Sequence, residues 1–431
     1  MHYVYMDNFR GFRETLIPLR KTNFLVGENS TGKSSFLSLL YLVSRPPFWF
    51  YPEFSIQEEL ELGGFSDIVS AWAEDKSSFK VGVVFTRKDK SGRTELAFSI
   101  HTFAEKDGTP QLVENTQLRA NKLTALVFES KRTKYRTLKS NTLFESEDEA
   151  IAEFVRLSHT EIGSTQGLKA FPRGIPSEPP LPVALSILQS LESGEKVVKN
   201  EFKAEIPIAL DMTWVAPIRT KPRRIYDGMK RSYSPEGEHI PLLLRKSLRS
   251  TSKSEKFADS LAAFGNASGL FETVVAHSFG RGNQTPFELL IKFKGAELNI
   301  NNVGYGVSQA LPLVVEFLTS EKNGTFAVQQ PEVHLHPKAQ AALGGLIFQL
   351  AAERKHAFFI ETHSDYLIDR YRLSMRNEPK PPDSQVVFFV RTPKGNEAHI
   401  LPISADGLYP SEQPNEFRDF FIKEEMSLLD I

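Results

Sequence analysis

The sequence predicts an α/β protein with mixed and parallel sheets, and three patterns indicate this fold class. An apolar strand at residues 24–26 runs into a glycine-containing loop, and a helical pattern continues from residue 36. The rest of the N-terminal part is rich in strand patterns. Between residues 287 and 360 strands and helices alternate, an order typical of parallel sheets. We therefore expect a discontinuous α/β domain that carries an inserted helical or irregular region.

The N-terminal lobe, residues 1–104, is predicted to start with short strands. Residues 2–26 alternate in the manner of strands and are broken by a turn at Phe9-Arg10-Gly11-Phe12. The segments 79–85 and 94–100 flank the turn sequence Asp89-Lys90-Ser91-Gly92, which predicts a β-hairpin.

The next segment, residues 105–205, has a weaker pattern and is predicted to be the insertion. A charged stretch leads to a helical pattern at 147–157, and five prolines follow between residues 172 and 182. Because proline ends helices and central strands, this part favours a mobile, Pro-rich connection.

The C-terminal lobe, residues 206–431, returns to regular elements. The predicted strands are 212–216, 287–293, 326–328, 357–360 and the hairpin 386–390 with 398–401, and the predicted helices are 257–264, 309–318 and 338–352. Near the end, Phe417, Phe420 and Phe421 recur at helical spacing. Packing of this face against the chain's own core is the favoured interpretation, and a partner surface is the alternative.

Composition excludes several classes of protein. The chain has 431 residues, 40% hydrophobic and 24% charged, with a net charge of -1, so it has no overall attraction to nucleic acid. Without cysteine it contains no disulfide, thiolate zinc site or cysteine nucleophile. No apolar run approaches the roughly 18 residues of a membrane span, and the N-terminus lacks a secretory pattern. We expect a cytoplasmic protein without membrane contact.

The glycine loop fits the phosphate-binding pattern G-x-x-x-x-G-K-[ST] from Gly27 to Ser34. Backbone N–H groups at the start of the following helix can surround phosphates, Lys33 can reach their outer oxygens, and the Ser34 hydroxyl can ligate Mg²⁺. The predicted cofactors are ATP and Mg²⁺. The predicted nucleotide-binding residues of this loop are Gly27, Glu28, Asn29, Ser30, Thr31, Gly32, Lys33, Ser34 and Ser35.

Three further segments place polar groups where a strand ends or a helix begins. Residues 302–309 form a second glycine-bearing loop before a helix. The strand at 326–328 runs into Gln329-Gln330-Pro331-Glu332, and the strand at 358–360 runs into Glu361-Thr362-His363-Ser364. Ligands of open α/β sheets bind at the carboxyl ends of strands, so we expect these groups near the phosphates.

Together these motifs resemble the ATP-binding heads of ABC-like, SMC-like and RecF-like ATPases, and above all the AAA15 branch related to the OLD family. The strings at 303–312, 331–337 and 362–364 carry the closer likeness. The resemblance implies an ABC/SMC-like head whose ATP lies between the P-loop of one copy and the signature loop of another. It implies that Gly304, Gly306 and Ser308 contact the γ-phosphate across a dimer. It also places His336 and Pro337 in the loop between heads and makes His363 the switch histidine.

The sequence departs from that group where two carboxylates would end the strand before the proline. Gln329 and Gln330 stand there, and an amide neither takes a proton nor adds charge to a metal shell. Gln329 is the predicted partner of the Mg²⁺ shell, Gln330 orients water, and Glu332 is either the general base or an organiser of the loop. We expect a slow ATPase, turning over below about 1 s⁻¹.

Among AAA15 proteins the chain most resembles the stand-alone ATPase subunits of Septu-type anti-phage systems, with those of PARIS systems as a rival. This resemblance implies a homodimer or larger even-numbered oligomer that regulates a separate HNH nuclease. The residues after His363 contain no Asp-x-Asp, so we expect no Toprim nuclease here. The alternatives are a RecF- or SMC-like DNA-repair clamp that binds DNA directly and, less favoured, a transporter subunit.

For two further groups of residues, the sequence leaves the binding partner open in one case and argues against a metal site in the other. Residues 219–256 contain eleven Lys and Arg against four acidic residues, which suits nucleic-acid phosphates, a solvated surface or an acidic protein equally well. The opening of this segment, residues 216–222, is also similar to a recurring string of the AAA15 branch, which implies that part of it serves the ATPase head rather than DNA. His334 and His336 suggest a metal by their spacing, but Pro331 and Pro337 disturb a regular strand and no cysteine supports the site. We therefore expect no zinc there.

Overall fold

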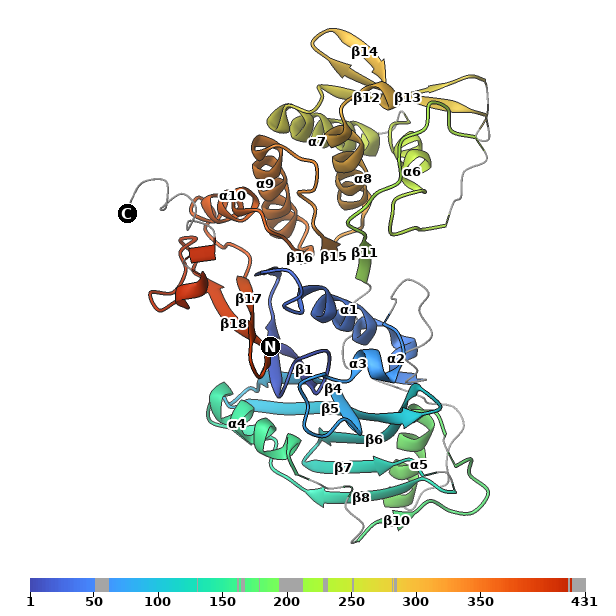
Figure 1. Cartoon of the computed structure of the whole chain (residues 1–431), viewed down its shortest axis with the longest axis vertical. Coiled ribbons are helices and arrows are strands. Elements are labelled where there is room, and N and C mark those ends of the chain that lie inside the picture. The colour runs from blue at the N-terminus through green and yellow to red at the C-terminus, as the bar shows by residue number, and fades with distance from the viewer. Residues whose placement is uncertain are drawn as a thin grey trace. The chain divides into compact units, whose positions relative to one another are not determined.

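The computed structural model describes most of the chain as two compact units (Figure 1). The described residues are 1–50, 62–129, 131–160, 163, 167–177, 179–193, 212–227, 232–249, 252–280, 282, 285–417, 419 and 420. Within them no helix is both long and apolar enough to cross a membrane.

The first unit comprises residues 1–19, 29–211 and 390–398 and contains a nine-stranded sheet. Its strand order is β10-β8-β7-β6-β5-β4-β1-β2, with β9 beside β5. The strands are β1 (His2–Asp7), β2 (Thr15–Leu19), β4 (Ser78–Lys88), β5 (Thr94–Lys106), β6 (Thr109–Arg119), β7 (Lys122–Val127), β8 (Lys134–Lys139), β9 (Leu143–Phe144) and β10 (Lys169–Ala170). The predicted hairpin at 79–100 is confirmed by the antiparallel pairing of β4 with β5.

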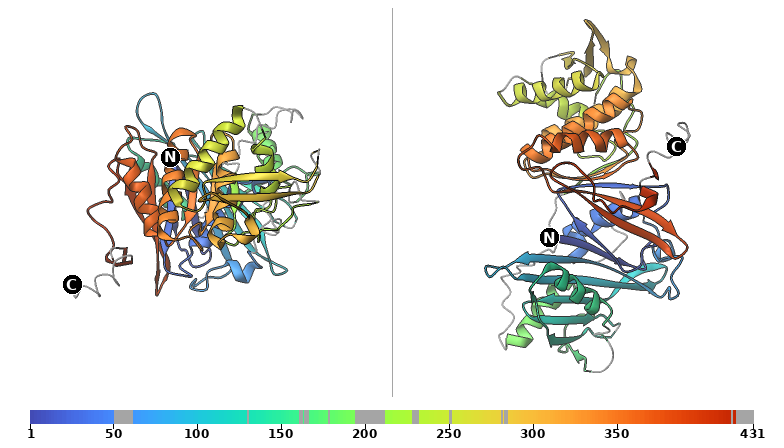
Figure 2. Two further views of the ribbon diagram at one scale, coloured as in Figure 1. Left: turned by 90° about the horizontal axis from the view of Figure 1, so that it is seen from above. Right: turned by 90° about the vertical axis from the view of Figure 1, so that its left-hand side faces the viewer.

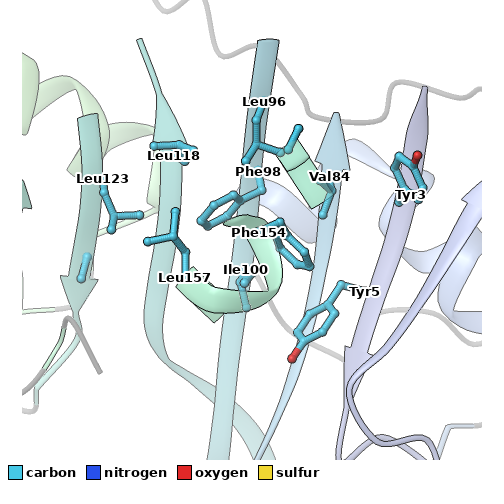
Figure 3. Packing of buried hydrophobic residues seen from close by; sticks show 12 residues of the cluster. Tyr3, Tyr5, Val84, Leu96, Phe98, Ile100, Leu118, Leu123, Phe154 and Leu157 are labelled. Atoms are coloured by element: carbon cyan, nitrogen blue, oxygen red, sulfur yellow. The ribbon is translucent and has the colours of Figure 1, made fainter. Parts of the chain in front are cut away.

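The two faces of this sheet are covered by different helices because side chains alternate along each strand. On one face Phe98 and Ile100 of β5 pack against Phe154 and Leu157 of α4 (Glu147–Ser158), as Figure 3 shows. On the other face His101 and Phe103 meet the aromatic rings of α2 (Pro46–Phe50). The other helices of the unit are α1 (Lys33–Ser44), α3 (Phe65–Ile68) and α5 (Leu181–Ser193).

The strands β6, β7 and β8 were not predicted from the sequence. They lie in the segment 105–205, where the pattern suggested a charged and irregular stretch. β6 has few large apolar residues, and its buried positions do not alternate regularly with exposed ones, so the strand periodicity of its sequence is weak. β6 is held in the sheet by pairing with β5 along almost its whole length and with β7 over residues 114–119, and its Leu118 belongs to the hydrophobic core.

The second unit comprises residues 20–28, 212–389 and 399–431 and contains a six-stranded sheet in the order β11-β15-β16-β3-β17-β18. The strands are β3 (Thr22–Gly27), β11 (Met212–Val215), β15 (Thr325–Gln329), β16 (Ala357–Glu361), β17 (Ser384–Thr392) and β18 (Gly395–Ile403). β11, β15, β16, β3 and β17 are parallel, which confirms the expectation from the α/β alternation. Parallel strands place all their carboxyl ends at one edge of the sheet.

Helices and a small sheet complete the second unit (Figures 1 and 2). The helices are α6 (Ile240–Ser247), α7 (Ser252–Ser268), α8 (Tyr305–Thr319), α9 (Pro337–Glu353) and α10 (Asp365–Met375), with a 3-10 turn at Ile300–Asn302. The predicted strand at 287–293 forms as β13 (Phe287–Phe293) but belongs to an antiparallel sheet with β12 (Thr273–Ser278) and β14 (Ala296–Asn299). The pairing of β13 could not be predicted from the sequence periodicity, because its partner strands β12 and β14 are only six and four residues long.

The C-terminal phenylalanines pack on the second unit, as the favoured interpretation predicted. Phe417 is 3% exposed and meets the rings of Phe388 and Tyr409. Phe420 also meets Phe388 and stacks beside His363. Phe421 lies outside the described residues.

Candidate nucleotide-binding site

The loop from Gly27 to Ser34 has the backbone of a phosphate-binding loop. β3 ends at Gly27 and α1 begins at Lys33, so strand, loop and helix follow each other as predicted. Gly27, Ser30 and Gly32 have φ angles of 144°, 62° and 99°, which lie in the left-handed region. Such turns direct successive N–H groups to one side, and Gly32 caps α1 without a side chain that would occupy its first N–H groups. The loop can therefore surround an anion.

Three residues outside the motif fix the shape of this loop within the first unit. A Cβ on Gly32 would lie 2.4 Å from the Phe12 ring and 2.9 Å from Asn396 Nδ2, so glycine is required by packing as well as by φ. The Arg391 guanidinium donates to the Ser30 carbonyl. The sequence motif did not point to Phe12, Asn396 or Arg391, because the last two come from the far end of the chain.

The side chains of the loop divide by exposure. Thr31 and Lys33 are buried, at 2% and 3% exposure, while Glu28, Asn29, Ser30 and Ser34 are exposed and Ser35 is partly exposed. The exposed Ser34 hydroxyl stands at the start of α1, where a P-loop serine ligates Mg²⁺. The predicted nucleotide-binding and metal roles of these residues remain predictions.

At the carboxyl edge of the six-stranded sheet, Gln329 lies beside a carboxylate that sequence reasoning did not assign. Gln329 ends β15 and is in register with Glu361, which ends β16 and is in register with Leu25 of β3. Gln329 Nε2 donates to Glu361 Oε2 at 3.5 Å, and Glu361 is 5% exposed. The signal in the sequence was the Glu361-Thr362-His363 string, but only the strand register reveals that Glu361 is next to Gln329.

Glu332 and His363 meet at the same edge. His363 N–H donates to Glu332 Oε1 at 2.7 Å, and the neighbouring Gln330 N–H donates to the Glu361 carbonyl at 2.8 Å. Gln330 has a φ of 41°, so the chain turns sharply after β15 and brings Glu332 back over the end of β16. Burial raises the pKa of Glu332, which suits a carboxylate that must accept a proton near neutral pH.

Arg219 is a second residue that the motif analysis did not assign to the site. It is 2% exposed, and its Nη2 donates to the Gln329 carbonyl at 3.5 Å. Its Nε and Nη1 and the Oε2 atom of Glu332 are buried without a hydrogen bond. Burial lowers the pKa of Arg219 to about 10, and the charge of Glu332 opposes this change. Arg219 therefore places a positive charge next to the predicted base.

The signature-like loop shows three different environments for its predicted phosphate contacts. A Cβ on Gly304 would meet nothing within 4 Å, so the fold itself leaves space at the start of α8. A Cβ on Gly306 would lie 3.1 Å from the His334 carbonyl, so this glycine lets α8 approach the loop after β15. Ser308 is 4% exposed and donates to the Tyr305 carbonyl at 2.7 Å. Gly304 is the best placed of the three for an external phosphate.

The two histidines between Pro331 and Pro337 have separate tasks in the fold. His336 caps α9, with its Nδ1 accepting from Ala339 N–H at 3.3 Å. His334 has a φ of 65° and meets the Tyr305 ring edge to face at 4.8 Å. In the described part of the chain, no group of three or more His, Asp or Glu is arranged to hold a metal ion.

The basic segment 219–256 is only partly a surface. Arg219 is buried, and so is Arg245, which donates to the carbonyls of Thr285 and Gly282 at 2.8 Å and lies over the Phe287 ring. Lys230 and Arg231 lie outside the described residues. The described cationic side chains that are exposed are Lys221, Arg223, Arg224, Lys246, Arg249 and Lys256.

Comparison with known proteins places this geometry in a family. The family model described as "AAA domain, putative AbiEii toxin, Type IV TA system" matches residues 22–369. No curated protein sequence matches the chain. One solved structure with a similar fold comes from work on "ATP-driven dimerization and DNA stimulated activation of SMC ATPases" and is 14% identical in sequence. The match covers 41% of this chain and 90% of the other chain, with a TM-score of 0.24. A structure of the recombination mediator protein RecF is 12% identical in sequence. The match covers 89% of this chain and 95% of the RecF chain, with a TM-score of 0.27.

Proposed function

Because the chain belongs to the AAA_21 family of AAA domains, we propose that it is an ATP- and Mg²⁺-binding switch that hydrolyses ATP slowly. The observation that carries this proposal is the left-handed P-loop backbone that leads from β3 into α1. ATP phosphates would bind the N–H groups of this loop, Lys33 would reach the outer phosphates, and Ser34 would ligate Mg²⁺. Mg²⁺ would neutralise phosphate charge when it is bound.

Slow hydrolysis follows from the groups at the sheet edge. Gln329 and Gln330 accept no proton, so Glu332 is the group proposed to deprotonate water. Its raised pKa and its bond from His363 N–H support this role. Arg219 favours the charged form of the carboxylate, which leaves less driving force for proton transfer.

The proposed biological role is that of a head whose nucleotide state controls a separate nuclease, as the Septu resemblance implies. Gly304, Gly306 and Ser308 would complete the ATP site of a second copy, so that ATP forms a homodimer or a larger even-numbered assembly. The open space at Gly304 supports a contact made from outside the chain. An HNH nuclease in anti-phage defence is the proposed partner, and a DNA clamp is the rival.

A pair of variants tests the composite site. We expect Lys33→Ala to lose ATP binding, and Gly304→Glu to bind ATP but fail to dimerise, because the added carboxylate would repel the γ-phosphate of the other copy. Mixing the two variants leaves one intact site per mixed dimer and should restore part of the ATP-dependent dimer in light scattering. Failure of the wild-type chain to bind ATP, or turnover above about 1 s⁻¹, would contradict the proposal. The proposed partner is tested by co-expressing the chain with an HNH nuclease. We expect the two proteins to co-purify in an ATP-dependent manner.

A further inference from the structure

The sheet edge lacks a carboxylate at the end of β15 but has one on the adjacent strand. From β11 through β15 and β16 to β3, the strands end in Val215, Gln329, Glu361 and Gly27. Of these four terminal residues, only Glu361 is acidic. Mg²⁺ at a nucleotide is usually held by one or two carboxylates together with phosphate oxygens and water.

Glu361 lies between the Gln329 strand and the P-loop strand. It is paired with Gln329 on one side and with Leu25 on the other, two residues before β3 ends at Gly27. The Thr362 N–H donates to the Leu25 carbonyl at 3.1 Å, so the end of β16 is held directly against the strand that enters the loop. In the sheet, position 361 on β16 is next to the P-loop strand β3, whereas position 329 on β15 is one strand farther away.

The amide at position 329 suits this arrangement. Gln329 Nε2 donates to Glu361 Oε2, whereas a carboxylate at position 329 would face Glu361 with a like charge. A buried charge is tolerated when donors or a cation compensate it, and Glu361 is 5% exposed. Gln329 therefore complements Glu361 rather than simply lacking an acid.

We infer that Glu361 supplies the carboxylate of the Mg²⁺ shell, in place of the acid missing at position 329. This inference rests on the proposed ATP site and names the residue that gives that site its metal dependence. Gln329 then positions Glu361 through its amide and does not itself provide charge to the metal. Glu332, which lies at the same edge, accepts from His363 N–H and interacts with the charge of Arg219, so it remains the group proposed to deprotonate water.

The test measures how ATP binding depends on Mg²⁺, using a fluorescent ATP analogue and Mn²⁺ paramagnetic resonance with the full chain. We expect Glu361→Gln to raise the Mg²⁺ concentration for half-maximal binding about tenfold or more, and to leave binding in EDTA unchanged. The exchange variant Gln329→Glu/Glu361→Gln should recover most of the loss, since it moves the carboxylate one strand over. Glu321→Gln, an exposed change just before β15, is the control.

The outcomes separate the two proposals. If the wild-type chain does not bind ATP, the proposed function fails. If it binds ATP and Glu361→Gln keeps the wild-type Mg²⁺ dependence with an unchanged melting temperature, only the inference about Glu361 is overturned. A role of Glu361 as a mere hydrogen-bond partner of Gln329 would lower the melting temperature without moving the Mg²⁺ curve. Should Glu361→Gln fail to fold, the paired variant Gln329→Leu/Glu361→Leu, which leaves neither hydrogen-bond partner unpaired, decides: a raised Mg²⁺ requirement supports the inference, and wild-type Mg²⁺ dependence overturns it.

Discussion

His101 shows how burial controls one titratable side chain in the first unit. It is 0% exposed on β5, its ring centroid lies 4.8 Å from that of Trp49 and 5.4 Å from that of Phe48, and neither ring nitrogen has a hydrogen-bond partner among the described residues. Burial lowers its pKa to about 3. Below the unfolded pKa of about 6.5 the unfolded state binds a proton that the folded state does not bind. The free energy of unfolding should therefore fall as the pH drops from about 6.5 towards about 3, by about 1.4 kcal/mol per unit.

Replacing His101 tests this account. We expect His101→Phe to remove this slope and to be more stable than the wild type at pH 5, because an apolar ring suits the aromatic surroundings and leaves no unbonded nitrogen. Urea unfolding at several pH values measures the difference. The exposed His159→Gln should keep the wild-type slope. An unchanged slope in His101→Phe would mean that other groups control the acid response.

At the scale of elements, α9 and α10 pack closely because of one glycine. A Cβ on Gly344 would lie 2.1 Å from the Leu367 carbonyl of α10, whereas a Cβ on the adjacent Gly345 would meet only the Arg370 side chain at 3.7 Å. We expect Gly344→Ala to lose about 2 kcal/mol or more of stability, because the backbone of α10 must shift. Gly345→Ala should gain about 0.5–1 kcal/mol from helix propensity. Equal effects of the two substitutions in urea unfolding would refute the close packing.

The elements predicted from the sequence are those whose own residues show a clear helical or strand periodicity of apolar positions. The strand, loop and helix at 22–44, the helix α9 and the strands β15 and β16 were all predicted within a few residues. Each carries its own apolar face, as in the stacked Phe326 and Phe358 of neighbouring strands. β6 to β8 were missed because polar residues interrupt their apolar pattern, although Leu118, Leu123 and Ala125 lie in the core of the first unit.

The site was predicted as motifs but not as contacts. The P-loop was predicted from its spacing, whereas Glu332 and His363 were named from the family resemblance, and their roles remain predictions. Arg219 and Glu361 needed three-dimensional information, since their meaning depends on the strand register and on burial rather than on neighbours in sequence. The motifs also did not show that Ser308 bonds to its own helix or that Gly306 serves packing.

For the whole molecule, the distribution of charge decides between a switch and a DNA clamp. The net charge is -1, and among the described cations of the segment 219–256, Arg219 and Arg245 are buried. Lys221 and Arg223 line a pocket together with Glu238, and Arg224 interacts with Glu288. Three of the six exposed cations that the structure describes in this segment are therefore close to an acidic group, which weakens their attraction to phosphates.

We expect the chain alone to bind duplex DNA more weakly than about 1 μM at physiological salt, and equally with and without ATP. Fluorescence anisotropy across a salt series measures both quantities. The variant Arg223→Glu/Arg224→Glu should reduce the salt slope by at most about two, since each lost phosphate contact changes it by about one. Reversing the exposed Lys246 and Lys256 is the matched control within the same segment. Nanomolar binding that requires ATP would instead favour the clamp.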